Sequence, residues 1–263
     1  MKILVCIKQV PDMEARFTPN SAGSWFDESG LAFRMNDYDE FAVEEAVRLK
    51  ELLGGEAEVT VLSVGPDRVV EMIRKAMAMG CDRGVHVKDD RAVERDPWQI
   101  ASMIADYARP LAFDLVFTGM QSLDRGSAQV GVLVAELLGL SCATTAVGFS
   151  CDGSAATVVR ELEGGTKAVV RLRLPALVTC QLGLNTPRYP TLPNILKAKK
   201  RELTVLSAEE IGLEAPLAVT TGFSQHERSA SCMVIEGEVE ELADRVLDVL
   251  NERTAVLRRG GGR

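Results

Sequence analysis

One stretch in the middle of the chain combines glycines, small polar residues and a helix start in the order that a phosphate site needs. It reads TGMQSLDRGSAQVG, from Thr118 to Gly131, and lies between the apolar runs at 115–117 and 130–138, which predicts strand, loop and helix. The first N–H groups of a helix lack partners within it and lie at the positive end of its dipole. The N–H groups from Gly126 to Gln129 could therefore bind a phosphate.

An ordinary helix start is the alternative interpretation of the same segment. Asp124 or Ser127 could be the N-cap residue, a role that these side chains have in many helices without any ligand. The segment also matches neither the P-loop nor the glycine fingerprint of dinucleotide-binding folds. The local pattern leaves both interpretations open.

Strands and helices alternate along the first half of the chain. Apolar runs predict the strands, whereas acidic starts, helical spacing and glycine ends predict the helices between them. We expect strands at 2–8, 58–64, 84–88 and 114–118, and helices at 39–53, 66–80, 97–108 and 130–138. Because such strands are joined by right-handed crossovers, the pattern predicts an α/β fold with a doubly wound, mostly parallel sheet.

The predicted sheet also predicts where a ligand binds. Ligands of doubly wound sheets lie beyond the carboxyl ends of the strands, where the strand order reverses. The strand ends at 6–12, 63–66 and 118–131 are therefore expected to face one crevice. Residues 14–35 contain Pro19, Gly23, Ser24 and Gly30, and they are expected to form a long loop or an irregular hairpin.

After Gly139 the pattern changes to short strands with glycine turns. Runs at 144–150, 156–162, 167–174 and 176–181 are expected to extend the sheet with antiparallel strands. Residues 183–202 carry three prolines and a basic helical turn. Residues 238–257 have the apolar spacing of a final amphipathic helix, and the tail after it is expected to be disordered.

Composition and charge exclude several classes of function. A net charge of −8 and scarce aromatics argue against nucleic acid as a partner. No apolar run is long enough to cross a bilayer, and the first strand is too short to be a signal peptide, so we expect a cytoplasmic protein without membrane insertion.

Catalytic and metal-binding patterns are also missing from the sequence. The six cysteines include no CxxC pair, and the only histidines are His86 and His226, so we expect no metal site. The sequence shows no nucleophile with a neighbouring base and no paired carboxylates, so we expect no catalytic residue.

Several separate motifs resemble those of one family, in the same order. They are KQVPD, NDYDEFAVEEAVRLKE, AMAMGCDRGVHV, GMQSLDRGSAQVG, VVRELEGG, RLPALVTCQLGLN and RYPTLPNILKAKK. From residue 2 to about residue 200 the chain resembles the beta subunit of electron transfer flavoprotein. Beyond Leu206 the resemblance becomes weak.

The resemblance implies a fold, a division of the chain and a cofactor. The fold is a nucleotide-binding α/β domain of the adenine nucleotide alpha-hydrolase-like type over residues 1–190. Residues 191–263 would form a recognition loop and a C-terminal arm that packs on the alpha subunit. In this family the electron-carrying FAD is held mainly by the alpha subunit, and the beta subunit holds AMP or, in electron-bifurcating members, a second FAD. We expect AMP, with FAD as the alternative.

Carried over by position, the resemblance places the nucleotide pocket at the same strand ends as the crevice. The residues are Cys6, Lys8, Asn36, Asp37, Tyr38, Asp39, Val64, Gly119, Met120, Gln121, Ser122, Leu123, Asp124, Arg125, Gly126, Ser127, Ala128, Gln129 and Val130. Arg125 departs from the family, which commonly has an acidic or small residue there. Its cation could bind a diphosphate or pair with Asp124.

Other matching positions imply contacts with partner proteins. Met13 matches a position close to the flavin of the alpha subunit, and Glu161 matches a glutamate that pairs with an arginine of that subunit. Leu192, with Pro193 and Ile195, matches the recognition loop that docks acyl-CoA dehydrogenases. Leu192 could instead pack within its own subunit.

The function implied is that of an electron carrier. With an alpha subunit, the chain would take electrons from flavin dehydrogenases such as acyl-CoA dehydrogenases and deliver them to a quinone-linked oxidoreductase. One alternative is an electron-bifurcating enzyme that oxidises NADH with a second FAD in this subunit. Another is a nucleotide-binding domain of the same fold without a redox role, which the segment TLPNILKAKK disfavours.

Overall fold

The computed structural model describes residues 1–224 and 233–254. These residues belong to two compact units, Met1–Phe223 and a second unit from Ser224 onward, and each is described by itself. The first unit contains a nine-stranded sheet, covered by helices, and a separate two-stranded sheet. The sequence-based fold class, α/β with a mostly parallel sheet, is confirmed.

The elements of the first unit follow the expected alternation closely. In the first half they are β1 (Lys2–Cys6), β2 (Gln9–Pro11), β3 (Phe33–Met35), α1 (Asp37–Leu52), β4 (Glu58–Gly65), α2 (Val70–Met79), β5 (Arg83–Lys88), α3 (Pro97–Ala108), β6 (Leu115–Gly119) and α4 (Val130–Leu138). In the second half they are β7 (Ser141–Cys151), β8 (Ala155–Glu161), β9 (Lys167–Arg173), β10 (Ala176–Cys180), α5 (Leu192–Lys200), β11 (Thr204–Ser207) and α6 (Ala208–Ile211).

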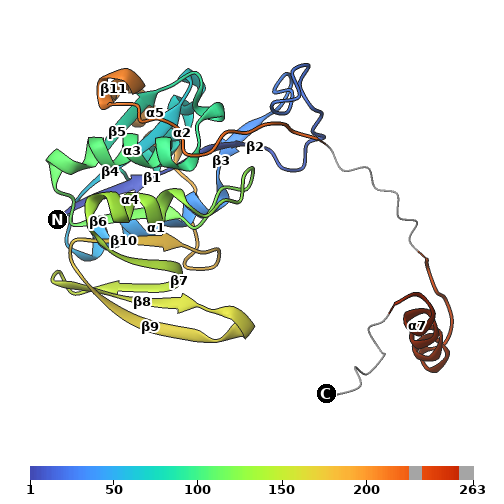
Figure 1. Cartoon of the computed structure of the whole chain (residues 1–263). Coiled ribbons are helices and arrows are strands. Elements are labelled where there is room, and N and C mark those ends of the chain that lie inside the picture. Colours follow the sequence, from blue (N-terminus) through green and yellow to red (C-terminus); the bar gives the residue numbers. More distant parts are fainter. Residues whose placement is uncertain (225–232, 255–263) are drawn as a thin grey trace. The chain divides into compact units, whose positions relative to one another are not determined.

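The strand order of the large sheet is β11-β5-β4-β1-β6-β10-β7-β8-β9 (Figure 1). β1 pairs in parallel with β4 on one side and with β6 on the other, and Cys6 faces Leu62 and Thr118 in these two pairings. The chain first winds from β1 towards β4 and β5 and then crosses back to β6. The strand order therefore reverses beside β1, where such sheets bind ligands.

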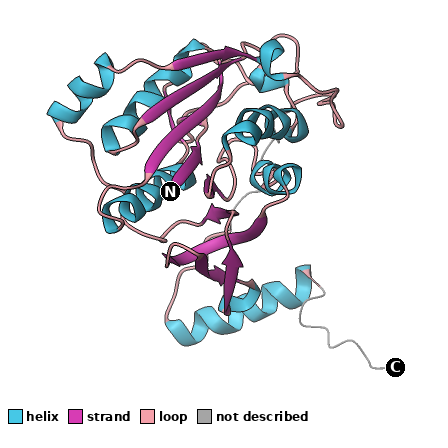
Figure 2. Ribbon diagram, turned by 90° about the vertical axis from the view of Figure 1, so that its left-hand side faces the viewer, coloured by secondary structure: helices cyan, strands magenta, loops and turns pink. Residues whose placement is uncertain are grey.

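Helices cover both faces of the sheet because alternate strand residues face opposite sides (Figure 2). In β1, Ile3 and Val5 belong to the apolar cluster that includes α1 and α2. The neighbouring residues, Leu4 and Cys6, belong to the cluster that includes α3 and α4. Burial on both faces explains why β1 is an almost uninterrupted apolar run.

The expectation of antiparallel strands after Gly139 is confirmed for the pairs β7-β8 and β8-β9 and was wrong for β10. β8 and β9 are antiparallel, as expected, but β10 lies between β6 and β7 and is parallel to both. All residues of β10 are buried. Its short apolar run is therefore typical of a central parallel strand rather than of a half-exposed hairpin strand. The short edge strand β11, parallel to β5, was not predicted from the sequence.

The segment between β1 and α1 is the expected irregular hairpin. β2 pairs with β3, and Pro11 is the last residue of β2. Beyond this pair, an isolated bridge joins Pro19 and Phe26. The rings of Trp25, Phe26 and Phe223 lie against one another, with ring centroids 4.5 to 6.3 Å apart.

The segment after β10 packs onto the helices of the first unit. Arg74 of α2 donates to the carbonyl oxygens of Ala198 and Arg201, at the end of α5. Asp96, which caps α3, accepts from the backbone N–H groups of Leu217 and Ala218. The compact unit thus runs to Phe223, past the division expected at residue 190. The packing of residues 191–263 on a second subunit stays a prediction.

The second unit contains α7 (Val239–Arg253), which confirms the predicted amphipathic helix. None of its residues is buried in the described structure. His226, Cys232, the last residues of the predicted helix (255–257) and the tail 258–263, expected to be disordered, lie outside the described residues. None of the described helices has both the length and the apolar character that crossing a membrane requires.

One arginine fixes the approach to α5. The Nε and Nη2 atoms of Arg188 donate to Glu44, 2.8 and 3.0 Å away, and its Nη1 and Nη2 atoms donate to Glu51, 2.6 and 2.9 Å away. Glu44 is buried in α1. The planar fork of the guanidinium can satisfy both carboxylates at once, and it ties residue 188 to α1.

Replacing Arg188 by methionine should lower the free energy of unfolding by about 2–3 kcal/mol, because the buried Glu44 carboxylate loses the guanidinium and keeps only the backbone N–H of residue 188. The matched control is Arg171→Met, which removes an exposed ion pair with Asp152 and should cost less than about 0.5 kcal/mol. Urea denaturation of the three proteins measures both changes. Equal losses in the two variants would contradict the role of Arg188.

Candidate nucleotide-binding site

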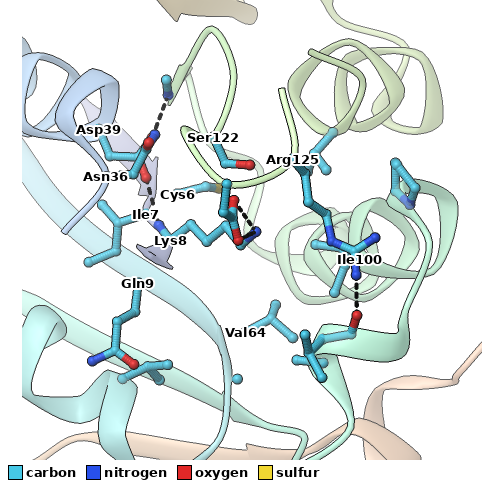
Figure 3. A pocket seen from close by; sticks show the side chains of 18 of the residues that line it. Cys6, Ile7, Lys8, Gln9, Asn36, Asp39, Val64, Ile100, Ser122 and Arg125 are labelled. Atoms are coloured by element: carbon cyan, nitrogen blue, oxygen red, sulfur yellow. Dashed lines mark hydrogen bonds and ion pairs between the residues drawn. The ribbon is translucent and has the colours of Figure 1, made fainter. Parts of the chain in front are cut away.

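The carboxyl ends of β1, β4 and β6 open into one crevice, as the strand-end argument predicted (Figure 3). Of the residues expected in the pocket, those that line it are Cys6, Lys8, Asn36, Asp39, Val64, Gly119, Met120, Gln121, Ser122, Asp124, Arg125, Ser127, Ala128, Gln129 and Val130. Asp37, Tyr38, Leu123 and Gly126 are not among the lining residues.

The start of α4 supplies backbone donors to this crevice. The helix begins at Val130 with Gln129 as its N-cap residue, and no side chain caps it. The N–H groups of residues 127–132 have no acceptor among the described residues. Gly126, expected to be a free donor, instead donates to the carbonyl of Ser122 at 2.8 Å. The free donors at the positive end of the helix dipole fit a phosphate.

Asp39 joins the two strands at which the strand order reverses. Its carboxylate accepts from the N–H of Lys8, after β1, at 2.6 Å and from the N–H of Gly119, at the end of β6, at 3.1 Å. A side chain at Gly119 would overlap the Asp39 carboxylate and approach Tyr38 Cβ to 2.7 Å. Burial raises the pKa of Asp39 to about 7, although these N–H donors favour the ionised form.

Asn36 braces the loop between β6 and α4. It occupies the N-cap position of α1, but its side chain makes no capping bond. Instead its Nδ2 donates to Gln121 O at 2.9 Å, and its Oδ1 accepts from Leu123 N at 3.0 Å. Tyr38 accepts from the Gln121 side chain. Leu123 and Tyr38 therefore shape the loop from behind the crevice.

Lys8 and Asp124, which both line the crevice, form an ion pair. Lys8 Nζ contacts both carboxylate oxygens of Asp124, at 2.6 and 2.7 Å. Burial lowers the pKa of Lys8, and Asp124 opposes that shift. Asp124 therefore ties the loop to the end of β1 and does not cap α4, contrary to the alternative interpretation of the sequence.

Arg125 lines the crevice, but its guanidinium forms no ion pair with a carboxylate of the described residues. Its Nη2 donates to the carbonyl of Val93, and its guanidinium lies 4.4 Å from the centroid of the Trp25 ring. Within the described residues it forms no ion pair, because Asp124 is engaged with Lys8. The structure thus rejects the pairing of Arg125 with Asp124.

Sequence reasoning missed the aromatic and basic wall of the crevice. Trp25, Phe26, Phe33 and Arg68 line it from the hairpin and from the segment before α2. The three aromatic residues follow no periodic pattern, so only the aromatic content of residues 14–35 could have indicated them. Among the described residues, no group of three or more His, Cys, Asp and Glu side chains is placed to hold a metal ion.

Comparison with known proteins identifies the family. The model of the electron transfer flavoprotein domain matches residues 24–211. The electron transfer flavoprotein subunit beta of Methylophilus methylotrophus is 35% identical over 260 residues, covering 96% of this chain and 98% of that protein. The chain belongs to the electron transfer flavoprotein beta-subunit family. The subunit beta of Mus musculus is 38% identical over 95% of the chain and 98% of its own length, and that of Bradyrhizobium diazoefficiens is 42% identical over 81% and 84%.

The positions that the resemblance links to partner contacts lie outside the crevice lining of this family member. Met13 is 42% exposed in the hairpin, and Glu161 is exposed at the end of β8. Leu192 is 69% exposed but is the first residue of α5, so the expected recognition loop is a helix start. Pro193 follows in the first turn, whereas Ile195 packs against the larger apolar cluster.

Gly119→Ala should lower the free energy of unfolding by about 1–3 kcal/mol, because the methyl group overlaps the Asp39 carboxylate and must displace it. Gly222→Ala is the matched control, since a methyl group there meets no atom closer than 4.0 Å. Thermal or urea denaturation compares them. If the Gly119 variant is as stable as the control, the packing of the Asp39 carboxylate does not require glycine at position 119.

The raised pKa of Asp39 predicts a pH dependence of stability. Because the folded protein binds this proton more tightly than the unfolded chain, the stabilisation is present below pH 4 and is lost as the pH rises through about 7. Asp39→Asn cannot titrate there. The stability difference between the wild type and this variant should therefore shrink with rising pH, by up to about 1.4 kcal/mol per pH unit. Urea denaturation from pH 5 to pH 8 tests this, and a constant difference would contradict it.

Proposed function

We propose that the chain is the beta subunit of a cytoplasmic, heterodimeric electron transfer flavoprotein. With an alpha subunit it takes electrons from flavin dehydrogenases, such as acyl-CoA dehydrogenases, and delivers them to a quinone-linked oxidoreductase. Family membership over most of the chain supports this function. The observation that carries the cofactor part of the proposal is the crevice beside β1, with free N–H donors at the start of α4.

The crevice is proposed to bind AMP in a structural role. The phosphate would accept from the N–H groups of residues 127–130, where the helix dipole favours negative charge. A ligand that binds only the folded state stabilises it by mass action. Because the loop residues are joined to β1 and α1 through Asp124 and Asn36, an occupied site would reinforce the same contacts.

In the proposed function the chain forms and breaks no covalent bonds of a substrate. Burial and the nearby Asp39 raise the pKa of the Cys6 thiol, so this side chain in the crevice stays protonated and is a poor nucleophile. The electron-carrying FAD would be held mainly by the alpha subunit, with Met13 near its ring and Glu161 at the subunit boundary. The chain would then supply binding and orientation rather than reacting groups.

Docking of the dehydrogenase is proposed at the start of α5. Leu192 is exposed there, next to Pro193, and the helix is fixed to α2 by Arg74. Arg188 fixes the preceding residues to α1. A side chain presented rigidly loses little conformational entropy when it enters a partner's pocket. Ile195 would support this presentation from within the chain.

The second candidate function is the electron-bifurcating form, with FAD in the crevice and NADH as donor. Arg125 favours it, because a cation without a carboxylate partner at this position suits a ligand with more than one phosphate. In this form the chain would contribute to an enzyme rather than to a simple carrier.

The test is to purify the full chain together with its alpha subunit, precipitate the protein and quantify the released nucleotides by chromatography. One FAD and one AMP per heterodimer are expected. Two FAD and no AMP would overturn the carrier proposal in favour of the bifurcating form. Failure to form a heterodimer, or to accept electrons from either a flavin dehydrogenase or NADH, would overturn both.

A further inference from the structure

The hairpin between β1 and α1 contacts two sides of the crevice. Its residues 13–31, which we call the flap, contribute Trp25 and Glu28 to the crevice lining. On one side, the Glu28 carboxylate pairs with Arg68, which lies before α2, at 2.9 Å. On the other side, the guanidinium of Arg125, in the loop before α4, lies 4.4 Å from the centroid of the Trp25 ring. The flap therefore joins the β4 side of the crevice to the α4 side.

Few contacts connect the flap to the rest of the chain. Within the described residues its backbone hydrogen bonds stay inside the hairpin, as from Asn20 N to Trp25 O, with one exception. The exception is Gly23 O, which accepts from Phe223 N at 2.7 Å. Phe26 of the flap is buried, but it belongs to neither of the two apolar clusters between the sheet and its helices. A segment with so few contacts to the core can open as a unit while the rest of the fold stays intact.

Phe223 supplies an aromatic ring to the flap from a distant part of the chain. Its ring centroid lies 5.8 Å from that of Trp25 and 6.3 Å from that of Phe26. Figure 1 shows the orange segment that leads to this residue reaching the blue hairpin beyond β2 and β3. Phe223 is not among the residues that line the crevice. It therefore holds the flap in place without facing a bound ligand.

The segment before Phe223 is fixed to the body of the first unit. Residues 214–223, which we call the strap, follow the last described helix of that unit. Asp96, the N-cap residue of α3, accepts from the N–H groups of Leu217 and Ala218 at 2.7 and 2.9 Å. Because α3 packs on the sheet, the strap links the flap to the same rigid body that forms the floor of the crevice.

We propose that the flap is a lid over the nucleotide crevice and that the strap holds this lid closed through Phe223. A nucleotide then enters and leaves only while the lid is open. The strap sets the rate of nucleotide exchange, whereas the groups that face the ligand set its affinity. This inference rests on the nucleotide site of the proposed function and adds a control over exchange to it.

Exchange of AMP on the heterodimer tests the role of Phe223. The AMP-loaded complex is mixed with an excess of isotopically labelled AMP, mass spectrometry follows the bound label, and equilibrium dialysis gives Kd. Phe223→Ala should raise the dissociation rate about tenfold, because the closed lid loses aromatic contacts of that order. Kd should change less than about twofold, because the closed state is weakened equally with and without AMP.

Two results of this experiment would overturn the inference. One is a dissociation rate that Phe223→Ala leaves unchanged. The other is an equal rise in the dissociation rate and Kd, which would show that Phe223 shapes the occupied crevice itself. Phe223→Tyr keeps the ring and should exchange AMP at nearly the wild-type rate. Exchange as fast as in Phe223→Ala would show that the ring does not hold the lid.

Tyr189→Ala is the matched control, since it removes an aromatic ring that is 94% exposed and lies outside the crevice lining. It should leave both the dissociation rate and Kd of AMP unchanged. If it speeds exchange as much as Phe223→Ala does, general loosening of the fold explains the effect and the inference is overturned.

Hydrogen exchange measures the opening of the lid without any nucleotide. Amides of residues 13–31 should exchange about tenfold faster in Phe223→Ala than in the wild type, while those of β1 keep their protection and show that the variant is folded. Equal flap exchange in the two proteins would contradict the lid. If the wild type retains no AMP, the proposed nucleotide role fails, and this measurement still decides whether Phe223 holds the flap. If AMP is retained but Phe223→Ala changes neither exchange, only the inference fails.

Discussion

The buried carboxylate of Asp39 connects the parts of the structure that form the crevice. It lies in the first turn of α1 and accepts from the backbone N–H groups that follow β1 and end β6. These are the two neighbouring strands between which the chain reverses its winding direction, so their ends have no crossover helix to cover both of them. A charged acceptor can satisfy both donors where no backbone carbonyl does. Gly119 follows from this contact, because any side chain there would occupy the space of the carboxylate.

The loop between β6 and α4 is held by side chains from distant parts of the chain. Asn36 bonds to Gln121 and Leu123 in its first half, and Asp124 is bound by Lys8. The polar groups in the first half of the loop make these contacts, whereas the N–H groups at the start of α4 have no acceptor among the described residues. This division explains how the same segment can be rigid and still offer donors to a ligand. Arg125, which forms no ion pair within the described residues, lies in the middle of that loop.

The surface proposed for docking depends on the same helix as the crevice. α1 carries Asp39 near its start and Glu44 and Glu51 further along, and the latter two bind Arg188 just before α5. One helix thus positions the nucleotide crevice and the exposed Leu192. Both features lie within the first compact unit, so their spacing does not depend on the second unit.

Much of the fold followed from local patterns. The alternation of apolar runs and helical spacing predicted β1, α1, β4, α2, β5, α3, β6 and α4 to within a few residues, because each element has a buried side that its residues must match. The motifs shared with the family located the crevice at the strand ends. The short apolar run of β10 is typical of a strand with both faces buried, but it does not show which strands lie beside it, so its place between β6 and β7 was not predicted. It also missed β11, a short strand at the sheet edge.

What the sequence by itself determined about this protein is therefore its family, its fold class and the loop that could bind a phosphate. Only the tertiary structure decided which charges are neutralised: Asp124 could have capped α4 or paired with Arg125, and it pairs with Lys8, which is far away in the chain. The physical reason is that helix and strand patterns report one buried side of each element, whereas ion pairs and aromatic walls form between elements. Their geometry exists only after β1, α1 and β6 have come together.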